Sequence, residues 1–432
     1  MNTTARCRIA IPALLVILAS IGPAGAAPAA SERLLPSAPP ASVGLSGERL
    51  ARLDAYMAAE IAARRKAGVV VLVARHGKVA YFKAYGEADA ESHRPMRTDA
   101  MFRLQSMTKP ITSVALLTLY EQGKFELSDP LSKYIPAFKD MKVLKAVGAG
   151  PGAGGAAEYE AAARPITVED VLRHTAGFSY GYFGDTPVDR AYRAADLAYN
   201  EQLPLKDFTA KLAALPLLYQ PGTHWHYSFA HDVQAYLVEV LSGMPFDAYC
   251  EKAIFGPLGM HDTVFGVPPE RKARFASIYH PDADGRILPG DNFGPDSYAR
   301  FTGHPYGGAS LSSTPMDYLR FAQMLLNGGR LGDVRILSRK TVELMTADHL
   351  APAIAPVAPG LGYGLGVGVL TSPAENGSLG TAGQFTWGGY ATTSFIIDPK
   401  EQLVAMVFAQ YQPSDFEFRN RTMNLIYQAI AD

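Results

Sequence analysis

Residues 69–82 read VVVLVARHGKVAYF, in which two runs rich in β-branched and aromatic residues flank His76-Gly77. Runs of this composition on either side of a short glycine turn predict a β-hairpin. A second pair of such runs, residues 394–397 and 403–408, surrounds Asp398-Pro399-Lys400-Glu401 near the C-terminus. The sequence therefore predicts one antiparallel hairpin toward each end of the chain.

The segments outside these hairpins show mostly helical periodicity. Ser46 precedes apolar residues at helical spacing, Leu50, Leu53, Met57 and Ile61, which predicts a first helix behind a serine cap. Further helices are predicted within residues 168–173, 231–241, 316–326 and 416–430.

These patterns together predict an α+β fold: one antiparallel sheet built from both chain ends, flanked by helices, with a mostly helical inserted lobe. Residues 46–135 and 331–432 would form the α/β lobe, and residues 136–330 the helical lobe. The Gly/Ala-rich stretch 147–163 is interpreted as a flexible excursion within that lobe.

The N-terminus has the pattern of an export signal. Arg6 and Arg8 precede the apolar run 9–21 and a small-residue stretch ending at Ala27, which predicts a cleavable signal peptide over residues 1–26. The run is shorter than the roughly 20 apolar residues that span a bilayer, so no stable membrane insertion is expected. A periplasmic or extracellular protein is predicted, with residues 27–45 as a disordered leader.

Composition excludes several classes of partner. The chain has 432 residues, 48% of them hydrophobic, and a formal net charge of −1, which indicates a globular protein with a large core. The absence of a basic run argues against nucleic acid or an anionic membrane surface as the main partner. Cys7 would leave with the signal peptide, so Cys250 could form no internal disulfide.

Residues 102–112, FRLQSMTKPIT, carry the strongest chemical signal. The apolar helical run 114–120 follows, which would place Ser106 at or near a helix N-terminus and Lys109 one turn later on the same face. A serine hydroxyl needs a partner to take its proton before it attacks a carbonyl carbon. Lysine does this only when its surroundings favour the neutral amine or when it works through another group, such as a tyrosine phenolate.

Two later elements supply the remaining parts of such a site. The stretch PGTHWHYSFA, residues 221–230, would present Tyr227 from a loop, and a phenolate beside a lysine can accept and return a proton. The stretch QFTWGGYA, residues 384–391, precedes the C-terminal hairpin. Its two glycines would let a substrate lie close to the strand backbone.

Ser-x-x-Lys, then Tyr-Ser-x, then Trp-Gly-Gly resembles the β-lactamase-like esterases known as family VIII. The similarity includes LRHTAG at 172–177, PGT at 221–223, YGGA at 306–309 and SST at 312–314. It implies a β-lactamase/transpeptidase-like fold without a cofactor or metal, with Ser106 as the acylated residue and Lys109 and Tyr227 as the base pair. It also implies an oxyanion hole formed by the backbone N–H groups of Ser106 and Tyr390.

The departures from that family's drug-binding relatives indicate the substrate. Tyr227-Ser228-Phe229 stands where β-lactamases have Tyr-x-Asn or Ser-x-Asn, and Trp387-Gly388-Gly389 stands where they have Lys-Thr-Gly. The strand lysine and hydroxyl that would hold a drug carboxylate are missing. Phe229, Trp387, Gly388 and Gly389 are therefore predicted to bind an uncharged small-molecule ester.

Several alternatives stay open at this stage. The protein could be a β-lactamase or D-amino-acid peptidase, an acyltransferase that uses the same acyl-serine, or a non-catalytic binding relative.

Ser179 lies in a G-x-S-x-G pattern, but a helix instead of a strand is predicted before it, so it is interpreted as a loop residue near the site. His224 and His226 suggest a metal, but no third ligand accompanies them. The loop 281–301 is expected to shape the pocket, and the sequence leaves acyl-chain length and oligomeric state open.

Overall fold

An eight-stranded antiparallel sheet organises the chain, with strand order β13-β14-β15-β16-β17-β1-β2-β3. Its strands are β1 (Gly68–Arg75), β2 (Lys78–Asp89), β3 (Arg94–Pro95), β13 (Leu361–Tyr363), β14 (Gly368–Leu370), β15 (Phe385–Gly389), β16 (Thr393–Asp398) and β17 (Leu403–Phe408). Strand β1 pairs with β2 on one side and with β17 on the other, so that Leu72 stands opposite both Phe82 and Met406. The prediction of one sheet assembled from both chain ends is confirmed.

The structure is a computed structural model that describes residues 1, 35–147, 157–197, 203–266, 268–290 and 305–432. Residues 35–432 form one compact unit. The predicted signal peptide, apart from Met1, lies outside the described residues, and so do residues 291–301 of the loop expected to shape the pocket. Among the described residues, none of the helices combines the length and the apolar character needed to cross a membrane.

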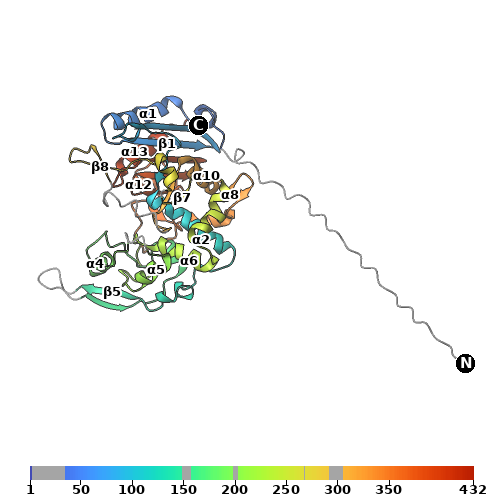
Figure 1. Cartoon of the computed structure of the whole chain (residues 1–432), viewed down its shortest axis with the longest axis vertical. Coiled ribbons are helices and arrows are strands. Elements are labelled where there is room, and N and C mark those ends of the chain that lie inside the picture. Colours follow the sequence, from blue (N-terminus) through green and yellow to red (C-terminus); the bar gives the residue numbers. More distant parts are fainter. Residues whose placement is uncertain (2–34, 148–156, 198–202, 267, 291–304) are drawn as a thin grey trace. The chain divides into compact units, whose positions relative to one another are not determined.

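Both faces of the sheet are buried, each against a different set of helices. Val70 and Leu72 of β1 belong to a core shared with α2 (Thr108–Glu121), α6 (Ala230–Ser242) and α10 (Pro315–Leu326). Alternate residues of the same strand, such as Val71, belong to a second core with α1 (Gly47–Ala62) and α13 (Phe416–Tyr427). Figure 1 shows α1 and α13 beside β1 at one end of the unit, with α4, α5 and α6 at the other. Burial on both faces explains why β1 is a continuous apolar run and not an alternating one.

The inserted part is largely helical, as predicted. Its helices and helical turns, which come after η4 (Leu131–Lys133), are η5 (Pro136–Phe138), α3 (Val168–Leu172), α4 (Pro187–Ala194), α5 (Leu205–Ala213), α6, α7 (Phe246–Cys250), η6 (Glu251–Phe255), α8 (Gly256–Leu258), η7 (Pro269–Arg274) and α10. The remaining helices are α11 (Arg339–Met345) and α12 (Pro373–Asn376). The C-terminal helix ends at Tyr427, three residues earlier than residue 430, where the sequence places its end.

Short strands also occur outside the eight-stranded sheet, and one corrects a prediction. They are β4 (Phe102–Arg103), β5 (Lys142–Val147), β6 (Ala157–Ala161), β7 (Val264–Phe265), β8 (Tyr279–Pro281), β9 (Ile287–Pro289), β10 (Leu311–Ser313), β11 (Arg330–Leu331) and β12 (Val334–Arg335). Residues 157–161, predicted to be part of a flexible excursion, pair with β5 as strand β6. The segment reads Ala157-Glu158-Tyr159-Glu160-Ala161, and its aromatic residue favours a strand. The Gly/Ala composition of the surrounding stretch conceals this signal.

Residues 35–45 are ordered, which corrects the prediction of a disordered leader up to residue 45. Ala38 N–H donates to Val79 O (2.9 Å), and η2 (Pro40–Val43) follows. Val43 is 2% exposed, and its carbonyl oxygen accepts from Arg75 Nη1 (3.0 Å). Backbone hydrogen bonds to the edge of the sheet and a buried valine therefore hold a segment whose proline-rich composition suggests a loose leader.

Candidate active site

Ser106 lies in a tight turn between β4 and α2. This turn, η3 (Gln105–Met107), leads directly into the helix, so the serine stands at its N-terminal end as predicted. Gln105 has a φ of 49°, in the left-handed region that residues other than glycine rarely adopt. Such backbone strain costs about 1–3 kcal/mol and is concentrated at functional sites.

Lys109 brings a buried amine to this serine. Its side chain is 0% exposed, and its Nζ donates to Ser106 Oγ (3.2 Å) and to the carbonyl oxygen of Gly308 (2.8 Å). A spacing of three residues places both groups on one face of the helical turn, as the sequence indicates. The contact between Nζ and Oγ is at the outer limit of the distance over which a base takes a proton directly.

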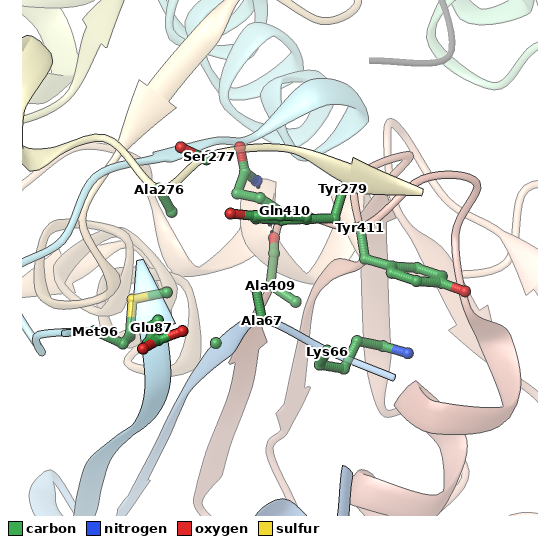
Figure 2. Close-up of a pocket in the computed structure, with 11 residues that line it drawn as sticks. Lys66, Ala67, Glu87, Met96, Ala276, Ser277, Tyr279, Ala409, Gln410 and Tyr411 are labelled. Atoms are coloured by element: carbon green, nitrogen blue, oxygen red, sulfur yellow. Dashed lines mark hydrogen bonds between the residues drawn. The ribbon is translucent and has the colours of Figure 1, made fainter. Parts of the chain in front are cut away.

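Gln410 fixes the strand that enters the serine turn. Its side-chain oxygen accepts from Arg103 N–H, and its Nε2 donates to Arg103 O, both at 3.2 Å. Figure 2 shows Gln410 in a small pocket at the end of the sheet, together with Lys66 and Tyr411. Because the amide pairs with both backbone groups of Arg103, it acts as a one-residue strand partner and holds β4 in place.

Tyr227 approaches Lys109 from the loop before α6. The Lys109 ammonium lies 4.6 Å from the centre of the Tyr227 ring and 5.5 Å from that of Tyr180. The half-buried Tyr227 ring also packs against Trp387, with their centroids 5.6 Å apart. The structure thus brings together Ser106, Lys109 and Tyr227, three residues that the sequence predicts to act together.

His174 holds both neighbours of Tyr227. Its carbonyl oxygen accepts from His226 N–H (2.9 Å), its Nδ1 contacts Ser228 Oγ (3.2 Å), and its ring centroid lies 4.9 Å from that of Tyr227. Burial, with a smaller effect of the Lys109 charge, lowers the pKa of His174 well below its usual range. The imidazole is therefore neutral and positions the Tyr227 loop without adding charge to it.

Asp232 is a buried carboxylic acid near Lys109 that the sequence analysis missed. It lies in the first turn of α6, is 4% exposed, and its Oδ1 accepts from Gly308 N–H (2.8 Å). Burial raises the pKa of Asp232 to about 6, although the Lys109 charge and the Gly308 N–H act in the opposite direction. Gly308 thus connects the two charged side chains, since it accepts from the lysine and donates to the aspartate. Its position within the YGGA motif is the sequence signal that could have led to Asp232.

The predicted substrate strand lies against the serine turn. A side chain at Gly389 would overlap the carbonyl oxygen of Leu104, two residues before Ser106, and a side chain at Gly388 would overlap the Arg419 guanidinium. The two glycines therefore admit neighbouring protein groups, which differs from the predicted reason, close approach of a substrate. Tyr390 follows Gly389 directly, so its backbone comes from a segment in contact with the serine turn. Its part in an oxyanion hole stays a prediction.

Phe229 is placed differently from the prediction that it binds substrate. Its ring is 5% exposed and packs in the core, with centroid distances of 4.4 Å to Tyr180 and 5.4 Å to Phe208. It is the N-cap residue of α6. Phe229 therefore supports Tyr180, whose ring faces Lys109 together with that of Tyr227.

The structure assigns Ser179 and the two loop histidines to supporting contacts. Ser179 is fully buried, and its Oγ donates to Asp189 Oδ1 (2.7 Å). The exposed His224 stacks on Tyr219 at a centroid distance of 4.2 Å, and His226 packs edge-on against the same ring. Within the described ranges, no group of three His, Cys, Asp or Glu side chains could hold a metal ion.

Comparisons with known proteins find a family model and related sequences that cover most of this chain. A family model described as "Beta-lactamase" matches residues 53–429. Esterase EstB of Burkholderia gladioli is 32% identical over 377 residues, which cover 81% of this chain and 87% of the relative. Protein Rv1367c of Mycobacterium tuberculosis is 34% identical over 360 residues, which cover 80% of this chain and 86% of the relative.

A solved structure shares the fold over nearly the full length. It is described as "EstCE1, a hydrolase with promiscuous acyltransferase activity", with a TM-score of 0.73 and 27% sequence identity. The match covers 89% of this chain and 99% of that one. The antiparallel sheet and the inserted helices are therefore features of a known architecture.

Proposed function

Because this chain belongs to the β-lactamase family of serine hydrolases, we propose that it hydrolyses carboxylic esters through an acyl-Ser106 intermediate. One observation carries the proposal: the fully buried Lys109 amine lies 3.2 Å from Ser106 Oγ and 4.6 Å from the Tyr227 ring. A hydroxyl, an amine and a phenol gathered in this way are the parts that a nucleophile and its proton-transfer partners require.

The proposed reaction begins with attack of Ser106 Oγ on the ester carbonyl carbon. The hydroxyl proton passes to the Lys109–Tyr227 pair, and the backbone N–H groups of Ser106 and Tyr390 stabilise the negative charge that develops on the carbonyl oxygen. Tyr227 returns the proton to the leaving alkoxide, which departs as an alcohol. The same pair then takes a proton from water, whose oxygen attacks the carbonyl carbon of the acyl-serine. The bond to Ser106 Oγ breaks, the pair returns the proton to that oxygen, and the acid leaves.

An uncharged ester is the substrate class that the site favours. The rings of Tyr180, Tyr227 and Trp387 surround the reacting groups, and such aromatic surfaces suit apolar acyl or alkoxy groups. Trp387 occupies the place where a strand lysine would attract a drug carboxylate. The similarity to esterase EstB supports this choice over a β-lactamase.

Two measurements test the proposal. A fluorophosphonate probe is expected to label the wild-type protein and to spare Ser106→Ala; equal labelling of both would move the nucleophile elsewhere. A short p-nitrophenyl ester should be hydrolysed faster than a chromogenic cephalosporin. Faster turnover of the cephalosporin would instead identify a β-lactamase.

Acyl transfer to an alcohol is a second candidate, because a solved structure that shares this fold at 27% sequence identity is described as having that activity. The first half of the reaction is identical, and the outcome depends on whether water or an alcohol attacks the acyl-serine. Adding an alcohol during turnover and analysing the products separates the two. A new ester in place of free acid would establish transfer.

Export through the N-terminal signal is also part of the proposal. Arg6, Arg8 and the apolar run 9–21 support it. N-terminal sequencing of the protein recovered from the expressing bacterium should start near Ala27. A protein that retains Met1 in the cytoplasm would exclude export.

A further inference from the structure

The loop Tyr180–Gly184 presents exposed aromatic side chains next to the catalytic tyrosine. Phe183 is 62% exposed and Tyr182 is 49% exposed. The centroid of the Phe183 ring nevertheless lies 6.0 Å from that of Tyr227, 6.1 Å from that of Tyr180 and 6.4 Å from that of His226. Large exposed apolar side chains gathered beside a site are typical of ligand contacts.

Hydrogen bonds fix the shape of this loop. Ser179 Oγ accepts from Gly181 N–H (2.8 Å) while it donates to Asp189 Oδ1 (2.7 Å). Arg193 of α4 donates to the carbonyl oxygens of both Gly181 and Gly184. The buried serine of the G-x-S-x-G pattern therefore braces the loop from inside. Phe183 is therefore exposed because the hydrogen-bonded loop holds it there, and not because the loop is flexible.

The chemistry of the site indicates which part of an ester reaches Phe183. The acyl carbon becomes bonded to Ser106, whereas the leaving oxygen must receive its proton from Tyr227. The alcohol part of the ester therefore continues beyond the Tyr227 phenol. Phe183 packs against Tyr227 and is more exposed than it, so its ring lies on the outer side of the tyrosine.

We propose that Phe183 is a specificity-determining residue that contacts the alcohol part of the ester and favours aromatic or bulky apolar alcohols. The inference rests on the proposed esterase function and extends it to one half of the substrate. An aromatic pair adds an increment beyond area burial that corresponds to about three- to tenfold in affinity. Selectivity between a benzyl and an ethyl alcohol should show this difference.

A series of acetate esters isolates the step concerned. Ethyl acetate and benzyl acetate give the same acetyl-Ser106, so the ratio of their kcat/KM values reports acylation only. Phe183→Ala should lower the benzyl-to-ethyl ratio by about fivefold, and Phe183→Leu by a smaller factor because it keeps apolar bulk. Tyr159→Ala, which removes an exposed aromatic ring from β6, is the matched control and should leave the ratio unchanged.

A second series, ethyl esters of acetic and phenylacetic acid, tests the assignment to the alcohol side. Its selectivity should not change in Phe183→Ala. An unchanged benzyl-to-ethyl ratio in a variant with wild-type melting temperature would overturn the proposal, and so would a change confined to the acid series. If the wild-type protein hydrolyses none of these esters in a Ser106-dependent way, the proposed function itself fails and this inference fails with it. The wild-type and Ser106→Ala measurements therefore distinguish the two failures.

Discussion

Replacing Asp232 with asparagine should make the protein more resistant to unfolding at alkaline pH relative to wild type. Asp232 is 4% exposed, and burial raises its pKa from 3.8 to about 6. A carboxyl group whose pKa is higher in the folded than in the unfolded protein keeps its proton on folding at intermediate pH. Its contribution to stability is therefore fully present below pH 3.8 and is lost as the pH rises through 6.

The size of the effect follows from these two pKa values. The difference between 3.8 and about 6 corresponds to about 3 kcal/mol of folding free energy between acidic and alkaline pH. At pH 4.5 the unfolded chain is already largely ionised, so about 2 kcal/mol of this loss falls between pH 4.5 and pH 8. Asparagine does not titrate, so it causes no such loss of folding free energy as the pH rises. Its side-chain oxygen can still accept from Gly308 N–H.

Urea unfolding of the wild-type protein and Asp232→Asn at pH 4.5 and pH 8 measures this effect. The free energy of unfolding of the variant, relative to wild type, should rise by about 2 kcal/mol between the two pH values. Other titrating groups cancel in this double difference. A constant difference between the two proteins at both pH values would show that Asp232 is ionised throughout, and the account of its burial would be wrong.

Two further predictions concern the catalytic groups. Tyr227→Phe keeps the ring contacts but removes the hydroxyl that moves the proton. The kcat/KM for a p-nitrophenyl ester should therefore fall by about 10²- to 10⁴-fold while the melting temperature stays unchanged. A loss of less than about threefold would show that Tyr227 takes no part in the mechanism. Gly389→Ala sets a Cβ against the backbone of Leu104 and should lower both stability, by about 1–3 kcal/mol, and activity. Gly388→Ala meets only the movable Arg419 side chain and should cost much less, and equal losses in a thermal melt and an ester assay would contradict this argument.

The outline of the fold could be predicted from the sequence because its signals are local. The runs around His76-Gly77 and the C-terminal pair differ from their surroundings in β-branched content, and helical periodicity marks the insertion. The burial of both faces of β1 was harder to predict from the sequence, because a continuous apolar run does not reveal which helices cover it. Residues 35–45 and strand β6 were mispredicted because their order depends on partners distant in sequence, such as Val79 for Ala38.

Some features of the candidate site can also be predicted from the local sequence, and others depend on the fold. The spacing of Ser106 and Lys109 is a property of one helical turn and can be derived locally, whereas their approach to Tyr227 depends on the resemblance to a known family. Asp232 was missed because an aspartate at the start of a helix normally interacts with the helix N-terminus in solvent. Only the packing of α6 against Gly308 shows that this carboxyl group is buried near an amine.

Ser179 shows why a motif must be judged by the elements around it. Its G-x-S-x-G pattern follows α3 instead of a strand, and its hydroxyl is already committed to Asp189 and to the Gly181 N–H. A nucleophile needs an accessible oxygen and a base. The Ser179 hydroxyl is fully buried and is hydrogen-bonded to a carboxylate that caps a helix, so a substrate cannot reach it. The same contacts hold the aromatic loop beside Tyr227. The serine that matches a nucleophile motif in the sequence thus influences the proposed reaction through the ring of Phe183.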